Sequence, residues 1–194
     1  PTRRRAEHGA QRDVGCGRTW RERAEELTDR EQIEVSRMVN EAQRTAMLAG
    51  CRKSRRGVVV WRGDTLDVLG RGANEPAVGA CDRSERCRRA CPRTCVHAEQ
   101  VAILDAMRWM PRAAIPVRLL HVKIDDKNFV APSGGPSCVE CSKLILTAGI
   151  ANVYLLHDIG WRSYPAVLFH ELTLAELKLY RGPSSALGVV GAGR

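Results

Sequence analysis

The chain has 194 residues, 44% hydrophobic and 27% charged, a balance that excludes a mainly disordered or fibrous chain and favours one globular domain. No uninterrupted apolar run approaches the roughly 20 residues that span a bilayer, so we expect a cytoplasmic protein that does not enter membranes. The formal net charge of +9 favours anionic partners such as nucleotides or nucleic acid, although a merely solvated basic surface would give the same charge.

Composition divides the chain into three parts. Residues 1–28 mix arginine and glutamate with few large apolar side chains and are predicted to form an N-terminal arm. The folded domain is predicted to cover residues 29–181. Glycine, serine and alanine predominate in residues 182–194, which indicates a flexible tail.

Apolar periodicity and turn residues predict the elements of the domain in chain order. The long segment 73–96 has no periodicity and is predicted to be a loop. The predicted helices and strands are a helix over 29–49, a hairpin of 58–61 with 66–69, a helix over 96–110, a strand over 119–124, a helix over 138–148, a strand over 152–156 and a helix over 165–179.

Two short motifs each open a predicted helix. His97 and Glu99 stand two residues apart at one helix start, and Cys138 and Cys141 stand three apart at another. Cysteines with this spacing project toward one side of a helix, so both can approach one ion, and one imidazole completes three ligands. Three protein ligands leave one tetrahedral position of zinc open, as in catalytic sites. Glu99 is then free to carry protons.

Together these motifs resemble the signature of zinc nucleobase deaminases, in which H-x-E is followed by P-C-x-x-C. Here Ser137 separates Pro136 from Cys138, which departs from that pattern but leaves both cysteine positions unaffected. The stretches Ser54–Val60 and Gly72–Asn74 also resemble the first hairpin of deoxycytidylate (dCMP) deaminases.

The resemblance implies a cytidine deaminase-like fold, a three-layer α/β/α sandwich around a mixed sheet of about five strands. It also implies hydrolytic deamination of cytosine in a small-molecule nucleotide, with dCMP to dUMP as first choice. One catalytic Zn²⁺ would be held by His97, Cys138 and Cys141, with Glu99 as the catalytic proton carrier. In that family an asparagine at the position of Asn74 contacts the sugar. We expect a homo-oligomer.

A second group of cysteines precedes His97. Thiols stay reduced in a cytosolic compartment, so cysteines there favour metal binding over disulfides. Their spacings depart from the usual metal-binding pairs, so unligated cysteines are an equal alternative to a second, structural zinc. The cysteines of this group are Cys81, Cys87, Cys91 and Cys95. Cys16 and Cys51 are interpreted as isolated.

Arginines alternate with these cysteines and are expected to lie near the mouth of the site. Arg83, Arg86 and Arg88 are candidates to bind a substrate phosphate. A solvated basic loop is the alternative for most of them.

Two other functions fit the same residues. A cytosine deaminase acting on single-stranded DNA or RNA would also suit the positive charge. A non-catalytic zinc-containing module could bind nucleic acid through its arginines. Glu99 argues against such a module, because a purely structural zinc site does not need that carboxylate.

Overall fold

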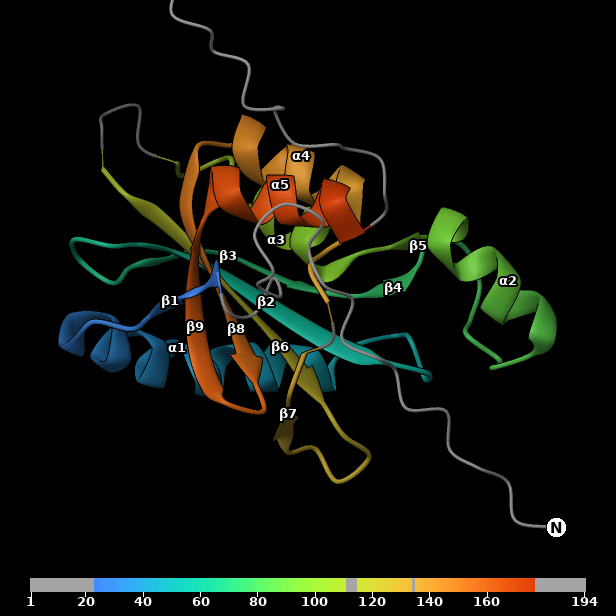
Figure 1. Ribbon diagram of the computed structural model, residues 1–194. Helices are drawn as coiled ribbons and strands as arrows, with labels where there is room; N and C mark the ends of the chain where they lie inside the picture. The colour runs from blue at the N-terminus through green and yellow to red at the C-terminus, as the bar shows by residue number, and fades with distance from the viewer. Residues whose placement is uncertain (1–22, 111–114, 134, 177–194) are drawn as a thin grey trace, which may run out of the picture.

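A computed structural model describes residues 23–110, 115–133 and 135–176 of the chain (Figure 1). The first 22 residues of the predicted arm and the predicted tail, 182–194, lie outside the described residues. Within the described ranges, no helix is long and apolar enough to cross a bilayer.

A mixed β-sheet forms the middle layer of the fold. Its strands are β1 (Glu25–Glu26), β2 (Arg55–Arg62), β3 (Val68–Ala73), β6 (Val117–Ile124), β7 (Val130–Ala131), β8 (Ile150–His157) and β9 (Gly160–Pro165). They run in the order β1-β9-β8-β6-β2-β3, and β7 pairs with β6. β6 and β8 are parallel, whereas the other neighbouring strands are antiparallel. Because β1 and β7 have two residues each, five longer strands carry the sheet.

Helices cover both faces of this sheet (Figure 1). They are α1 (Asp29–Met47), α3 (Ala98–Ala106), α4 (Val139–Thr147) and α5 (Ala166–Glu176). α1 packs against β2 and β6 on one face, while α3, α4 and α5 lie together on the other. The arrangement confirms the predicted three-layer α/β/α sandwich.

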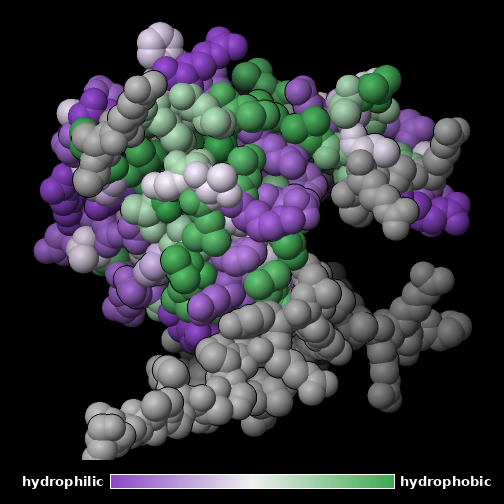
Figure 2. All heavy atoms as spheres, turned by 90° about the horizontal axis from the view of Figure 1, so that it is seen from above, coloured by the Kyte–Doolittle hydropathy of each residue, from purple (hydrophilic) through white to green (hydrophobic). Residues whose placement is uncertain are grey.

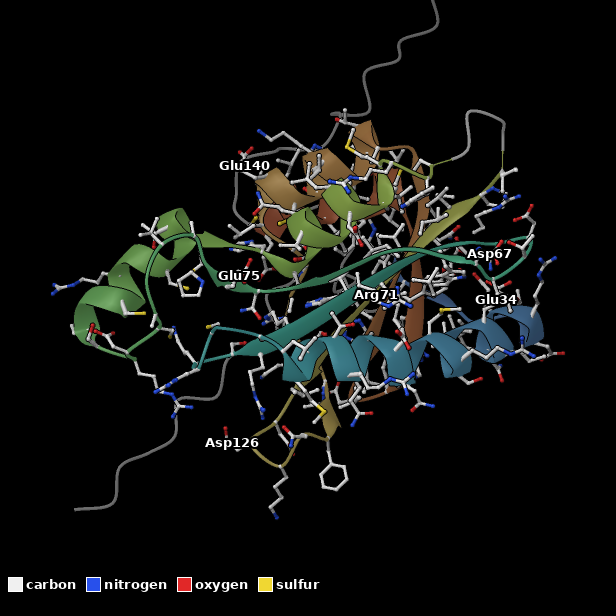
Figure 3. The ribbon with its side chains drawn as sticks, turned by 180° about the vertical axis from the view of Figure 1, so that it is seen from behind. Glu34, Asp67, Arg71, Glu75, Asp126 and Glu140 are labelled. Carbon is white, nitrogen blue, oxygen red and sulfur yellow. The ribbon has the colours of Figure 1, made fainter. Side chains whose placement is uncertain are left out.

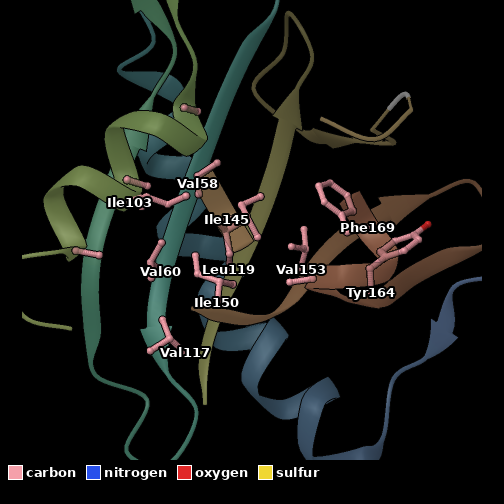
Figure 4. Packing of buried hydrophobic residues seen from close by; sticks show 14 of the residues in the cluster. Val58, Val60, Ile103, Val117, Leu119, Ile145, Ile150, Val153, Tyr164 and Phe169 are labelled. Carbon is pink, nitrogen blue, oxygen red and sulfur yellow. The ribbon is translucent and has the colours of Figure 1, made fainter. Parts of the chain in front are cut away.

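Alternation along β2 divides the core between the two faces of the sheet. Val58 and Val60 pack with α3, whereas Val59 and Trp61 pack with α1, because successive side chains of a strand point to opposite faces. Figure 4 shows the α3 side, where Ile103 lies over the valines of β2. The strand is buried on both faces and therefore appears in the sequence as a continuous apolar run.

A buried carboxylate fixes α1 to the sheet. Glu34 accepts hydrogen bonds from the Arg30 guanidinium at 2.9 Å and from the Trp61 indole at 3.4 Å. It also forms a salt bridge with Arg118 of β6. One carboxylate thus joins the helix to two strands, and its partners compensate the cost of burying its charge.

The segment predicted to be a loop over 73–96 is partly helical, so that prediction was wrong. It contains β4 (Glu75–Pro76), α2 (Glu85–Thr94) and β5 (Cys95–Val96), with β4 and β5 paired. The Ser84 side chain caps α2 by accepting a hydrogen bond from the Cys87 amide at 3.0 Å. α2 projects from one side of the sandwich and packs little on the core, and its sequence contains few apolar residues (Figures 1 and 2).

The C-terminal part also contains a strand that the sequence analysis missed. β9 forms a tight hairpin with β8, and Gly160, at φ 103°, provides the turn conformation. α5 consequently begins at Ala166. Glu25 and Glu26, which were placed in the predicted arm, pair with β9 and extend the sheet.

Small residues bring α3 unusually close to β3. A Cβ atom at Gly72 would lie 2.2 Å from the carbonyl oxygen of Ala98, and one at Gly70 would lie 2.3 Å from that of Ala102. Only glycine permits this approach of helix and strand backbones. The N-terminus of α3 is thereby set at the end of the sheet where β3 finishes and β2 begins.

Replacing Gly72 with alanine is expected to destabilise the protein, because the new Cβ would meet backbone atoms of α3. Overpacking of this kind costs about 1–3 kcal/mol, which corresponds to a fall of roughly 3–10 °C in melting temperature. Thermal unfolding of Gly72→Ala can be compared with that of Gly135→Ala, where the nearest neighbour would be 3.8 Å away. Equal melting temperatures for the two variants would contradict the proposed close packing.

Candidate functional site

The structure brings the three predicted metal ligands together. His97 is the N-cap residue of α3, and Cys138 is the N-cap residue of α4. The Nδ1 atom of His97 lies 3.2 Å from the Sγ atoms of both Cys138 and Cys141, and the two sulfur atoms are 3.2 Å apart. Among the described residues, these three form the one group of at least three potential ligands whose donor atoms all lie within 4.8 Å of one another.

The helix starts hold this group in place. The His97 amide donates to the Gln100 side chain at 2.9 Å, which fixes the first turn of α3. The Cys138 sulfur accepts a hydrogen bond from the Cys141 amide at 3.4 Å, as a side chain at an N-cap position does. The positive end of the α4 dipole also favours a thiolate at this position.

The electrostatics of the two thiols favour the binding of a cation. Hydrogen bonding from Cys141, together with His97, lowers the pKa of Cys138 to about 4, although burial opposes this shift. The hydrogen bond with Cys138 and burial raise the pKa of Cys141, and repulsion between the two thiolates adds to this rise. A divalent cation would offset this repulsion, and two thiolates with one imidazole are a common zinc donor set. The three residues can therefore bind a metal ion such as zinc.

Glu99 lies in the first turn of α3 and is outside the group of ligands. Its side chain is buried, with 5% of its surface exposed, and it accepts a hydrogen bond from the hydroxyl of Ser137. Burial raises the pKa of Glu99, but the charge of His121 when that imidazole is protonated, the Ser137 hydrogen bond and Arg56 lower it by more, so the net pKa lies below its ordinary value. A buried carboxylate held in its ionised form is suited to accept a proton.

Ser137, which departs from the family pattern, thus has a definite contact. It occupies the turn before α4 and joins that turn to the carboxylate of Glu99. The sequence alone gave no sign of this contact, which depends on folding because Ser137 and Glu99 are 38 residues apart.

Arg56 and His121 complete the surroundings of Glu99, and the sequence analysis missed both. His121 is buried, with 4% of its surface exposed. An Nη atom of Arg56 lies 3.2 Å from the Nε2 atom of His121. Burial lowers the pKa of His121 to about 4, which leaves the imidazole neutral at pH 7. The signal in the sequence was strand alternation, which places Arg56 on the same face of β2 as Val58.

Asn74 holds the start of β2. Its Oδ1 accepts from the Arg56 amide and its Nδ2 donates to the Ser54 carbonyl, both at 2.8 Å. Its backbone carbonyl also accepts from the Cys51 amide at 3.3 Å. The contact with a sugar stays a prediction, and the structure adds a role in fixing the strand on which Arg56 stands.

Of the three candidate phosphate ligands, Arg83 has a side chain that the structure describes. Arg83 lines an open depression of about 470 Å³ together with Arg52, Lys53 and Asp126. Asp126 lies at the end of the molecule from which α2 projects (Figure 3). Arg86 and Arg88 stand on α2, and their side chains lie outside the described parts.

In the second group of cysteines, Cys81 and Cys87 approach each other, whereas no three described thiols of this group lie within 4.8 Å of one another. The Sγ atoms of Cys81 and Cys87 are 3.7 Å apart. Cys81 also interacts with Cys51, and Cys95 interacts with Cys91. The prediction that Cys51 is isolated was therefore wrong, because folding brings the loop after α1 against Cys81. Cys16 lies outside the described residues.

Cys81 has the surroundings of a thiolate. Hydrogen bonds from the amides of Arg83 and Arg52 lower the pKa of Cys81 to about 7, with further lowering by Cys87 and Cys51. Burial and the neighbouring Cys91 raise the pKa of Cys95 to about 11. The distance between the Cys81 and Cys87 sulfur atoms matches the edge of a tetrahedral zinc–sulfur site, about 3.8 Å for zinc–sulfur bonds of about 2.3 Å.

Comparison with known proteins gives matches among solved structures. No family model and no curated protein matches the chain. The cytidine deaminase from Burkholderia pseudomallei has a TM-score of 0.50 and 15% identity, covering 74% of this chain and 96% of that one. The dCMP deaminase from the cyanophage S-TIM5, in complex with dCMP and dUMP, has a TM-score of 0.44 and 20% identity over 66% and 82% of the two chains. The cytidine deaminase from Mycobacterium tuberculosis has a TM-score of 0.38 and 16% identity, covering 70% and 90%.

The likeness to the Burkholderia enzyme defines the architecture of this chain. The chain has a cytidine deaminase-like α/β fold, in which helices pack on both faces of a mixed β-sheet. At 15% identity the comparison establishes the fold. The chemistry has to be argued from the residues of the site.

Proposed function

We propose that the protein is a zinc-dependent hydrolase that deaminates cytosine in a nucleotide, with dCMP as its preferred substrate. The observation that carries this proposal is a buried carboxylate, Glu99, beside but outside a convergent group of one imidazole and two thiols. A purely structural zinc site has no use for such a carboxylate. The fold is compatible with this function, since the Burkholderia structure that it resembles is a cytidine deaminase.

The reaction replaces the amino group at C4 of cytosine by an oxygen atom from water and releases ammonia. Zinc held by His97, Cys138 and Cys141 would lower the pKa of a bound water to about 7. Glu99 accepts a proton as water attacks C4 and delivers it to the ring nitrogen N3. It then assists transfer of a proton to the departing amine, so that uracil and ammonia result. Ser137 orients the carboxylate through its hydrogen bond.

The choice of a nucleotide rests on positive charge near the start of β2. Arg52, Lys53 and Arg83 line one depression, and Arg52 and Lys53 precede Arg56 by only four and three residues. A charge-assisted contact to phosphate is stronger than a neutral hydrogen bond. Three cations at one place suit a single 5′-phosphate better than the long groove that a polynucleotide needs.

Glu99→Ala is expected to abolish deamination while zinc stays bound, because the ligands are other residues. Loss of general acid–base catalysis alone lowers turnover by about 100- to 10,000-fold. Ammonia release and zinc content would be measured on the same samples. Glu140→Ala is the matched control, since Glu140 lies in the same helix turn as Cys141 but its side chain is 69% exposed. Near-normal turnover by Glu99→Ala would disprove the assigned role, and loss of zinc would make Glu99 a ligand.

A comparison of dCMP, deoxycytidine and a cytosine-containing single strand tests the substrate. One charge-assisted contact contributes about 1.5–3 kcal/mol, so dCMP should exceed deoxycytidine by roughly ten- to a hundredfold in kcat/KM. Turnover is measured at low and moderate salt. Efficient, strongly salt-dependent turnover of the strand with negligible turnover of dCMP would instead identify a polynucleotide deaminase.

We further propose that the second group of cysteines binds a structural zinc ion, with Cys51 as an additional candidate beside the four cysteines predicted from the sequence. The close pair of Cys81 and Cys87 and the amide hydrogen bonds to Cys81 support this proposal. The ion would fix α2, which has few contacts with the sandwich, next to the start of α3.

Freshly purified, metal-replete protein should therefore contain about two zinc ions per chain. Cys87→Ser is expected to remove one of them and to lower the melting temperature, because metal binding at a structural site contributes to folding. Cys141→Ser should remove the other. Elemental analysis and thermal unfolding of the three proteins provide the measurement. A single zinc ion per wild-type chain would show that the cysteines of the second group bind no metal.

A further inference from the structure

A buried strand carries a cation into the candidate active site. Arg56 is the second residue of β2, and its neighbour Gly57 faces α1, where an added Cβ would lie 2.1 Å from the carbonyl oxygen of Ala42. Because side chains alternate along a strand, Arg56 must face the opposite side, which α3 covers. That is the side on which Val58 packs with α3.

The adjacent Arg55 has different surroundings from Arg56. Its guanidinium donates to the Asn128 side chain at 2.6 Å and to the Asp125 carbonyl, both in the turn between β6 and β7. Arg55 is thereby occupied by contacts away from the site. The two neighbouring arginines have opposite surroundings, which makes them a matched pair.

His121 fixes the direction of the Arg56 guanidinium. In the register of β2 and β6, His121 pairs with Val58, so its side chain lies on the same face as that of Arg56. An arginine has only donors, so the 3.2 Å contact requires His121 to accept through Nε2. This contact uses one of the five N–H groups of the guanidinium. Val58 pairs with His121 on one side and with Gly72 on the other, and Gly72 lies against the backbone of Ala98, so the first turn of α3 with Glu99 lies over the same part of the sheet.

We propose that Arg56, oriented by His121, selects cytosine by donating a hydrogen bond to the carbonyl oxygen at C2 of the ring. The inference rests on the proposed deaminase function and specifies which base the site accepts. Arg56 is in this role a specificity-determining residue, and His121 is a positioning residue.

The order of atoms around the ring explains this selection. Deamination places the carbon that bears the amine at the metal and the adjacent ring nitrogen at Glu99. In cytosine the next atom is C2 with its carbonyl oxygen, which is an acceptor. In adenine the corresponding carbon carries only hydrogen. A cationic donor beside Glu99 therefore gains a partner from cytosine and is left without one by adenine, which is the situation that gives strong discrimination.

The test measures binding and turnover separately. Equilibrium binding of dCMP and dAMP is measured on zinc-loaded protein carrying Glu99→Ala, so that no substrate is consumed. Adding Arg56→Met is expected to weaken dCMP binding by about 10- to 100-fold, because it removes a charge-assisted hydrogen bond, and to leave the weak binding of dAMP nearly unchanged. Arg55→Met, the control, should leave both affinities unchanged.

A second variant guards against a folding defect. Arg56→Lys keeps a positive charge and a donor but has neither the reach nor the fork of arginine, so its preference for dCMP should fall between those of the wild type and Arg56→Met. Zinc content and melting temperature are recorded for each variant. In proteins with Glu99 intact, Arg56→Met should raise KM for dCMP and reduce the ratio of dCMP to dAMP turnover.

The outcomes separate this inference from the function on which it rests. If the wild type deaminates dCMP while Arg56→Met and Arg56→Lys keep its affinity and its base preference, the inference is wrong and the deaminase function stands. Preferential deamination of dAMP by the wild type would likewise overturn it. If zinc-loaded wild type deaminates neither nucleotide and no single strand, both the function and the inference fail.

Discussion

The close contact between α3 and β3 determines where every part of the site lies. Gly70 and Gly72 leave no side chain between the strand and the helix, so α3 rests on the backbone of β3. Its N-terminal residues, His97 and Glu99, are consequently placed over the end of the sheet where β2 begins. α4 packs beside α3 and contributes the two cysteines from its own N-terminus. A larger residue in β3 would shift one ligand relative to the other two.

The close contact of α3 with β3 also explains how charged groups are buried near one another. Glu99 is surrounded by Ser137, Arg56 and His121, which come from the turn before α4, from β2 and from β6. Next to Arg56 and His121 on the same faces of β2 and β6 are the apolar residues Val58 and Leu119. The imidazole of His121 is neutral and contacts the guanidinium of Arg56. No second positive charge from His121 therefore stands beside that guanidinium. The site therefore combines a buried carboxylate, a cation and a metal-binding group.

The sequence was sufficient to predict those features that depend on local patterns. The helix starts at His97 and Cys138, the apolar strands and the sandwich follow from periodicity, from turn residues and from the motif resemblance. α2 was missed because a helix that packs little on a core contains few apolar residues, and β9 was missed because its alternation is short. The ligand spacing identified the metal-binding group, but neither spacing nor composition could place Cys51 against Cys81. Arg56 and His121 are 65 residues apart, and their contact exists only through strand pairing.

The Glu34 cluster gives the two faces of the sandwich different mechanical properties. On the α1 side, one carboxylate is bonded to groups of the helix and of two strands, so sliding or tilting of α1 would separate several charged partners at once. On the other side, α4 and α5 are joined to the sheet mainly by apolar packing, which tolerates small displacements. Small displacements would therefore be concentrated in α4 and α5, while α1, the sheet and the closely packed α3 serve as the rigid frame.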